Sequence, residues 1–207
     1  MTTTERSNVC LLFGAPGVGK GTQGKVLGVI PGFVHLSTGD MFRALDPLSE
    51  LGKVFREYSL KGELVPDSFT IRLWTQYVEQ LKAQGRYRPD TDMLVLDGIP
   101  RNAAQARLME PLIDVLAVVH LDAADRAEMI LRLKRRAEKE KRGDDAKEEV
   151  IRRRLQVYDQ ETRPVLECYP RGVIHMVDAM GSPASVLGHV LAVLAPVQEK
   201  HFGNALA

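Results

Sequence analysis

The stretch GAPGVGKGT at residues 14–22 directly follows the apolar run VCLLF at residues 9–13. A buried strand, a glycine-rich turn and a lysine at the start of a helix form a cradle for phosphate. Glycines let backbone N–H groups approach an anion, and the helix N-terminus carries a partial positive charge. The spacing matches G-x-x-x-x-G-K, except that Gly21 stands where a hydroxyl residue is usual and Thr22 follows one position later. The stretch predicts a polyphosphate-binding loop that includes Lys20.

Short apolar segments alternate with longer helical segments over the rest of the chain. We predict strands at residues 9–13, 34–36, 93–96, 115–121 and 173–177. Predicted helices follow the phosphate loop and cover residues 39–61, 67–84, 102–110, 123–141, 147–169 and 183–198. Continuously apolar strands are typical of parallel sheets that helices cover on both faces. The alternation therefore predicts the α/β class, with a doubly wound, five-stranded parallel sheet.

The composition is that of an ordinary globular protein. The chain has 207 residues, 27% of them charged, and a formal net charge of +1. This near-neutral charge gives no reason to expect a nucleic acid or an anionic membrane as a partner. Residues 1–8 are polar and lack the apolar core of a signal peptide, and Cys10 and Cys168 lie far apart in the sequence. We therefore expect one domain with small insertions, in the cytoplasm.

Two segments interrupt the alternation of strands and helices. A long helical insertion spans residues 37–88, and a highly charged segment spans residues 132–154. In α/β folds, excursions near the carboxyl ends of strands form lids and substrate clamps.

The charged segment contains many arginines with glutamates between them. Arg132 and Arg136 are four residues apart and share a helix face, whereas Arg142 precedes two aspartates. The usual meaning of such a run is a solvated helix face. Closure of several arginines over a polyphosphate is the functional alternative, and spacing alone does not choose among them.

Charged residues also follow the predicted strand at residues 93–96. Asp97 ends this strand, and a carboxylate beside a phosphate loop can hold Mg²⁺ directly or through water. The alternative is an aspartate that caps a turn. Arg101 follows Pro100 and would emerge at the ligand edge of the sheet, where a guanidinium can bind phosphate oxygens bidentately. By itself Arg101 would be taken as a surface arginine. For Asp97, which lies beside the phosphate loop, we favour the functional interpretation.

The segment HLSTGDMFR at residues 35–43 contains a strand end, a polar turn and a helix start. Helix capping by Ser37, Thr38 or Asp40 is the simple interpretation. Arg43 lies near the opening of the predicted helix at 39–61, where the helix dipole disfavours a cation. A phosphate bound beside Arg43 would offset this mismatch.

Taken together, these segments closely resemble the adenylate kinase family of nucleoside monophosphate kinases. The resemblance covers nearly the whole chain and is carried by GAPGVGKGTQ (14–23), HLSTGDMFR (35–43), GELVPD (62–67), DGIPR (97–101) with Gln105, and Asp144-Asp145 with RRRL (152–155).

The resemblance implies an ATP site around the phosphate loop. The ATP phosphates would be held by Gly17, Val18, Gly19, Lys20, Gly21 and Thr22. Arg132 would lie on the adenine ring, and the loop that includes Gly181 would contact the same ring through backbone groups. Asp97 would orient hydrated Mg²⁺. The transferring phosphoryl group would be enclosed by Arg136, Arg142 and Arg154.

The resemblance also implies an AMP site. Its phosphate would be held by Arg43 and Arg101, with Arg142 and Arg154 also reaching it. The nucleoside would be surrounded by Thr38, Glu63, Leu64, Val65, Gly98 and Gln105. Thr38 favours AMP, since relatives that phosphorylate UMP and CMP tend to have alanine there. Gln105 agrees, because an amide can pair with the adenine edge.

The implied reaction is Mg·ATP + AMP ⇌ 2 ADP, and its implied catalytic residues are Lys20, Arg101, Arg136, Arg142 and Arg154. The implied parts of the chain are a core (1–36, 66–135 and 155–207), a monophosphate-binding insertion (37–65) and a lid (136–154). We expect the insertion and the lid to move on binding. Five residues separate Arg136 from Arg142, which resembles the short-lid form of the family, so no zinc is expected. The family also implies a monomer.

The sequence departs from the family pattern at two places. Ile99 replaces the usual phenylalanine of DGFPR, and the stretch before Arg154 is one residue longer than typical, which leaves Arg152 and Arg153 as alternatives. A UMP/CMP-type kinase is the nearest alternative function. A GTPase-like switch is more distant, because the sequence contains no N-K-x-D guanine motif.

Overall fold

The computed structural model describes residues 6–140 and 147–203. Its five strands form one sheet in the order β2-β3-β1-β4-β5, and every adjacent pair is parallel. The strands are β1 (Ser7–Phe13), β2 (Phe33–Ser37), β3 (Met93–Asp97), β4 (Ile113–Asp122) and β5 (Ile174–Asp178). The prediction of a five-stranded parallel α/β sheet is confirmed.

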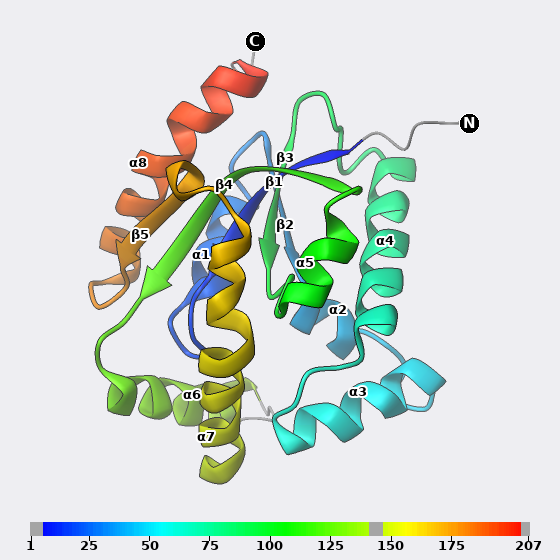
Figure 1. Cartoon of the computed structure of the whole chain (residues 1–207), viewed down its shortest axis with the longest axis vertical. Coiled ribbons are helices and arrows are strands. Elements are labelled where there is room, and N and C mark those ends of the chain that lie inside the picture. Colours follow the sequence, from blue (N-terminus) through cyan, green and yellow to red (C-terminus); the bar gives the residue numbers. More distant parts are fainter. Residues whose placement is uncertain (1–5, 141–146, 204–207) are drawn as a thin grey trace.

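Helices cover both faces of this sheet (Figure 1). The α-helices are α1 (Lys20–Leu27), α2 (Thr38–Arg43), α3 (Glu50–Lys61), α4 (Asp67–Ala83), α5 (Ala103–Met109), α6 (Arg126–Glu140), α7 (Glu148–Val157) and α8 (Pro183–Phe202). None of the described helices is long and apolar enough to cross a membrane.

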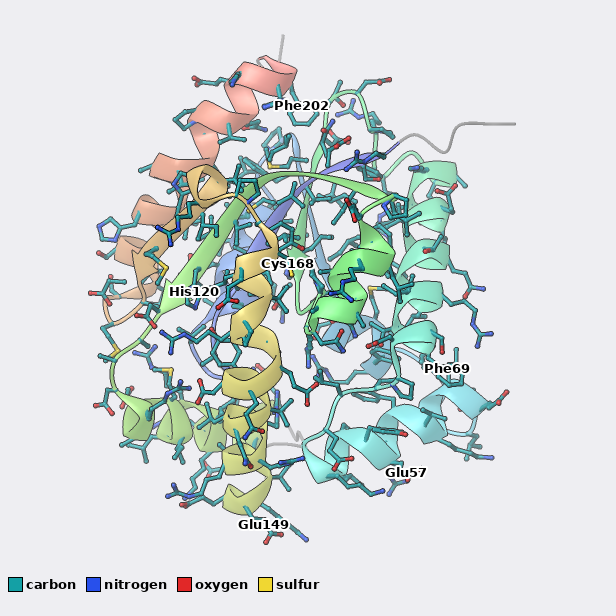
Figure 2. All side chains as sticks on the ribbon, in the orientation of Figure 1. Glu57, Phe69, His120, Glu149, Cys168 and Phe202 are labelled. Atoms are coloured by element: carbon teal, nitrogen blue, oxygen red, sulfur yellow. The ribbon has the colours of Figure 1, made fainter. Side chains whose placement is uncertain are left out.

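The core has two layers because side chains alternate along each strand. Val9 and Leu11 of β1 pack with α4 and α5 on one face, whereas Cys10 and Leu12 pack with α1 and α8 on the other. All four are almost fully buried, which explains why this run is continuously apolar. Figure 2 shows the side chains that fill these layers.

The predicted helix at residues 39–61 is wrong as a single element. The chain forms the short helix α2, leaves helical geometry over residues 44–49, and begins again at α3. Ser49 caps the second helix by accepting a hydrogen bond from the backbone N–H of Gly52 at 3.0 Å. Pro47 lies in the break and cannot supply a helical N–H.

This break also corrects the argument about Arg43. Arg43 is the last residue of α2, not a residue near the opening of a long helix. A cation at a helix C-terminus is favourable, so no dipole mismatch exists for a phosphate to offset.

The predicted helix at residues 147–169 is continuous only in part. After α7 the chain widens into a π turn, η2 (Tyr158–Thr162), and then tightens into two 3₁₀ segments, η3 (Arg163–Cys168) and η4 (Arg171–Val173). Pro164 lies at the start of η3. The helices α2 and α3, together with α6 and α7, lie near the carboxyl ends of β1, β2 and β3 (Figure 1).

Candidate active site

A cavity of about 670 Å³ opens at the carboxyl ends of β1, β2 and β3. It brings together every predicted site residue within the described part of the chain. These are Gly17, Val18, Gly19, Lys20, Gly21, Thr22, Thr38, Arg43, Glu63, Leu64, Val65, Asp97, Gly98, Arg101, Gln105, Arg132, Arg136, Arg154 and Gly181. Arg142 lies outside the described residues.

The phosphate loop joins β1 to α1 and requires glycine for close packing. Gly17 has a φ of +86°, and a Cβ atom added there would lie 2.9 Å from the carbonyl oxygen of Met129 on α6. A larger residue would therefore be strained and would push α6 away from the loop. The loop backbone stays close to α6, which carries basic residues of the cavity wall.

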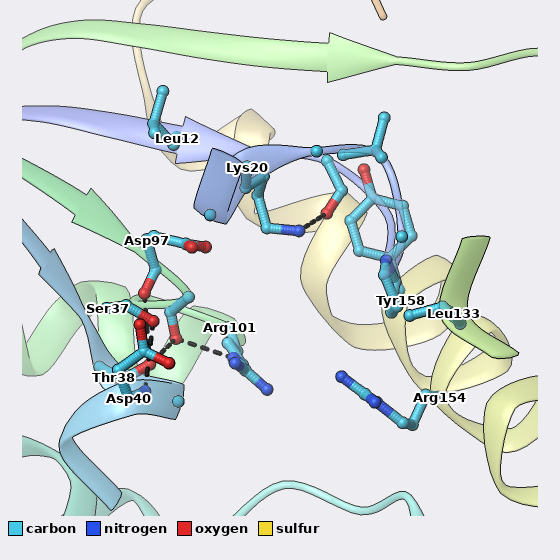
Figure 3. A pocket seen from close by; sticks show the side chains of 18 of the residues that line it. Leu12, Lys20, Ser37, Thr38, Asp40, Asp97, Arg101, Leu133, Arg154 and Tyr158 are labelled. Atoms are coloured by element: carbon cyan, nitrogen blue, oxygen red, sulfur yellow. Dashed lines mark hydrogen bonds between the residues drawn. The ribbon is translucent and has the colours of Figure 1, made fainter. Parts of the chain in front are cut away.

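Lys20 is the first residue of α1, and its ammonium group lies against its own loop. Nζ donates to the carbonyl oxygen of Gly14 at 2.6 Å (Figure 3), and also to that of Ala15 at 3.1 Å. The pKa of Lys20 is lowered from 10.5 to about 8, mainly because the ammonium group is buried; Asp97 opposes this shift, and nearby arginines contribute to it. A bound polyphosphate would compete for the ammonium group and would favour its charged form.

This lowered pKa predicts a pH-dependent affinity for polyphosphate. In the free protein Lys20 loses its proton as the pH rises through about 8, whereas a bound anion keeps the proton in place. The dissociation constant of ATP should therefore rise above that pH, by at most about tenfold per pH unit. Titration calorimetry on both sides of this pH measures the effect.

The matched control is Lys20→Arg, because a guanidinium stays charged throughout this range. Its ATP affinity should vary little with pH. A wild-type affinity that stays constant through pH 8 and above would contradict the prediction.

Asp97 is the last residue of β3 and lines the cavity. Its carboxylate is mostly buried, and Oδ2 lies 4.0 Å from Nε2 of His35. Mg²⁺ is commonly held by one or two carboxylates together with substrate phosphates and water. A single carboxylate beside the phosphate loop fits this mode of binding. Within residues 6–140 and 147–203, no group of three or more His, Cys, Asp or Glu side chains comes together.

The carbonyl oxygen of Gly98 is shared by two predicted site residues. The hydroxyl of Thr38 and Nε of Arg101 both donate to it at 2.8 Å. Gly98 has a φ of +84°, and a Cβ atom added there would lie 2.8 Å from Oγ1 of Thr38. Thr38 and Arg101 are thus held by one backbone group, which no sequence pattern identifies.

Gln105 is almost fully buried, and both ends of its amide are held by the protein. Oε1 accepts from the backbone N–H of Arg101 at 2.7 Å, and Nε2 donates to Oδ1 of Asp67 at 2.8 Å. Each end keeps capacity for one further hydrogen bond. Asp67, the last residue of GELVPD, had no role predicted from the sequence, and the structure shows that it orients this amide.

The basic wall of the cavity comes from α2, α6 and α7. Arg43 pairs with Asp40 at 2.6 Å. Arg132 donates to Glu128 at 3.1 Å. Arg101 and Arg154 extend toward one another across the pocket (Figure 3). Arg135 and Lys139 also line the cavity, although no sequence pattern distinguishes them from the other basic residues of α6.

The structure also separates the three consecutive arginines of α7. Arg152 pairs with Glu148 at 2.6 Å, and Arg153 donates to Gln156 at 3.1 Å. Only Arg154 of the three lines the cavity. Its role there stays a prediction.

Comparison with known proteins identifies the family. The sequence model of adenylate kinase matches residues 12–173, more than half of the chain. The chain belongs to the adenylate kinase family. It is 38% identical to the adenylate kinase of Kocuria rhizophila over 190 residues, which cover 89% of this chain and 97% of that protein.

Two further adenylate kinases are similarly close. That of Maricaulis maris is 39% identical over 191 residues, and that of Synechococcus sp. strain CC9311 is 40% identical over 192 residues. Each alignment covers 89% of this chain and 97% of the relative.

Several cavity residues of this adenylate kinase family member were missed by sequence reasoning. Phe42 and Phe55 stack with ring centroids 5.1 Å apart and join α2 to α3. Tyr158 and Thr162 enter the wall from the π turn. The aromatic pair bridges a helix break that was not predicted, and the π turn shifts the helical period, so neither was visible as a pattern.

Proposed function

We propose that this chain catalyses the reversible, Mg²⁺-dependent transfer of a phosphoryl group from ATP to AMP, giving two ADP. The observation that carries the proposal is one cavity with two phosphate-binding sides. We assign the phosphate loop with Lys20 to one side and Arg43 with Arg101 to the other, and all of them line the same cavity. Arg154 reaches the space between these sides from α7 (Figure 3).

The proposed chemistry needs positioning and charge neutralisation more than a covalent nucleophile. Lys20 and the loop amides would hold the β- and γ-phosphates, and Arg101 would hold the acceptor phosphate. Arg136, Arg142 and Arg154 would balance the charge that develops during transfer. Bound Mg²⁺ would neutralise phosphate charge, and Asp97 would hold it through coordinated water.

We further propose a division of the chain into a core and two closing segments. The core comprises residues 1–36, 66–135 and 155–207, the monophosphate-binding segment comprises 37–65, and the lid comprises 136–154. Closure of both segments would exclude water, which would otherwise accept the phosphoryl group. Both segments contribute side chains to the cavity wall, Arg43 and Val65 from the first and Arg136 and Arg154 from the second, which supports this division.

We also propose that the chain acts as a cytoplasmic monomer without nucleic-acid or membrane partners. The formal net charge of +1 and a cavity formed within one chain support this proposal. Light scattering with and without nucleotides tests the monomer, and a dimer that forms only with nucleotide would contradict it.

One assay tests the reaction itself. ATP is mixed in turn with AMP, UMP, CMP and GMP in the presence of Mg²⁺, and ADP formation is measured. We expect turnover with AMP, and AMP should have the highest kcat/KM of the four monophosphates. Fastest turnover with UMP or CMP would favour the alternative, a UMP/CMP-type kinase, and no turnover with any monophosphate would overturn both.

Thr38 offers a sharper test of AMP preference. In Thr38→Ala, Gly98 loses one of its two hydrogen-bond donors and the pocket widens beside the acceptor base. We expect kcat/KM for AMP to fall by about five- to tenfold, the scale of one lost hydrogen bond. The kcat/KM values for UMP and CMP should change less, so the preference for AMP over these two monophosphates should decrease.

The control is Thr91→Ala, which removes a hydroxyl outside the cavity. It should keep the wild-type order of monophosphates. Equal losses for AMP, UMP and CMP in Thr38→Ala would contradict a role for Thr38 in choosing the base.

A further inference from the structure

Three side chains at four-residue spacing line the cavity along α7 and the π turn. They are Arg154, Tyr158 and Thr162. Tyr158 is the C-cap of α7 and still has helical φ and ψ angles, so it shares a face with Arg154 one turn earlier. The rotation of this helical turn about its axis therefore sets the side on which the Cα–Cβ bonds of both residues project.

The hydroxyl of Tyr158 is held by the sheet. His120 of β4 places Nε2 at 2.8 Å from this hydroxyl, and its Nδ1 lies 3.1 Å from Sδ of Met176 on β5. His120 is 2% exposed and is paired within the sheet on both sides, with Phe13 and with Met176. The position of the imidazole is thus fixed relative to the sheet, and Figure 2 shows His120 on β4.

Both partners are expected to be neutral. Burial lowers the pKa of His120 and raises the pKa of Tyr158 to about 12. A neutral phenol can donate to Nε2 while Nδ1–H faces the thioether sulfur, an arrangement that uses both ring nitrogens.

Neighbouring residues of the π turn are tied to other elements. Arg126 of α6 pairs with Asp159 at 2.6 Å, and its guanidinium lies 6.0 Å from the centroid of the Tyr158 ring. The hydroxyl of Thr162 donates to the backbone carbonyl of Arg101 at 2.8 Å. The turn is therefore anchored on β4, on α6 and on the loop that carries Arg101, and α7, which carries Arg154, directly precedes it in the chain.

We propose that the hydrogen bond between Tyr158 and His120 positions Arg154 for phosphoryl transfer. Tyr158 is a positioning residue, because it acts through Arg154 and not on the phosphates. This inference rests on the proposed function. Its physical basis is that a displacement of about 1 Å at a catalytic group can cost a large factor in rate.

The test is Tyr158→Phe, which keeps the ring and its packing and removes only the hydroxyl. We expect kcat to fall by about three- to tenfold, the scale of one hydrogen bond, with little change in KM for ATP. The control is Tyr169→Phe, which removes a tyrosine hydroxyl outside the cavity and should leave kcat unchanged.

A double-mutant cycle separates positioning from a general structural role. If Tyr158 acts through Arg154, then Tyr158→Phe should have no further effect on kcat in an Arg154→Ala background. A loss of the same factor in both backgrounds would overturn the inference.

Two substitutions of His120 test the same bond from the other side. His120→Gln keeps a side-chain acceptor and should retain most of kcat, whereas His120→Leu should match Tyr158→Phe. Equal activity of these two variants, with thermal unfolding showing both folded, would overturn the inference.

Wild-type turnover distinguishes failure of the inference from failure of the proposed function. An active wild type whose Tyr158→Phe variant keeps the full kcat would overturn the positioning role alone. A wild type without turnover would overturn the proposed function and this inference with it.

Discussion

Replacement of Lys20 by alanine is expected to lower kcat for phosphoryl transfer by about 10²- to 10³-fold, the effect of removing one electrostatic stabiliser from a preorganised site. The ammonium group is the cation of the phosphate loop, and it hydrogen-bonds to the loop carbonyls of Gly14 and Ala15. No other described side chain of the loop carries a positive charge. Steady-state kinetics with saturating ATP and AMP measure the loss.

The same variant should fold at least as well as the wild type near neutral pH. Folding lowers the pKa of Lys20 from 10.5 to about 8, so the charged form is disfavoured in the folded state. This destabilisation is fully present below the folded pKa and disappears as the pH rises toward the unfolded value. The thermal midpoint of Lys20→Ala should therefore equal or exceed that of the wild type at pH 7.

The matched control is Lys200→Ala at the exposed end of α8, which should change neither kcat nor the affinity for ATP. A folded Lys20→Ala enzyme with near-normal turnover would refute the role assigned to Lys20. A strongly reduced thermal midpoint at pH 7 would instead show that the lysine supports the loop structurally.

Replacement of Arg101 by alanine should lower kcat/KM for AMP by about 10²- to 10³-fold, because a bidentate cation on the acceptor phosphate is lost. ATP affinity should change less, because Arg101 is proposed to hold the acceptor phosphate whereas the phosphate loop and Lys20 are proposed to hold ATP. The turn itself should persist. Its bonds to Gln105 and Thr162 use the backbone N–H and carbonyl of residue 101, which alanine retains.

Arg101→Lys keeps the charge but lacks the planar fork, so its activity should lie between those of wild type and alanine. Arg107→Ala, on the exposed side of α5, is the control for loss of an arginine. Separate titrations of ATP and AMP decide the outcome. An unchanged dependence of rate on AMP would refute the assignment, and an equal loss for both nucleotides would refute its placement on the acceptor side.

The apolar strands and the phosphate loop were predictable because their signals are local. A continuous run such as residues 9–13 is short, bounded by glycine and buried on both faces, which leaves few alternatives. The helix over residues 39–61 was wrong because helical periodicity continued across Pro47 while capping by Ser49 started a second helix. The break thus follows local signals, whereas the stacking of Phe42 on Phe55 that accompanies it is a contact between two helices.

The basic residues and the aspartate that line the cavity could be predicted from the sequence. The groups that hold these side chains in position could not. Charged residues in known motifs indicate which groups meet phosphate. The backbone carbonyl of Gly98 and the bond between His120 and Tyr158 depend on φ angles and on a π turn, which residue identity does not encode locally. The residues proposed to contact the ligands could therefore be predicted from the sequence, whereas the groups that hold those residues in position could not.

The carbonyl oxygen of Gly98 has a consequence for how this protein could evolve. It accepts from both Thr38 and Arg101, so the residue proposed to choose the base and the residue proposed to hold the phosphate share one partner. A substitution at residue 38 that broadens base preference would also loosen the anchor of the arginine. Divergence toward another monophosphate would thus be epistatic, and a first step at Thr38 would lower activity until a second substitution restored the hold on Arg101.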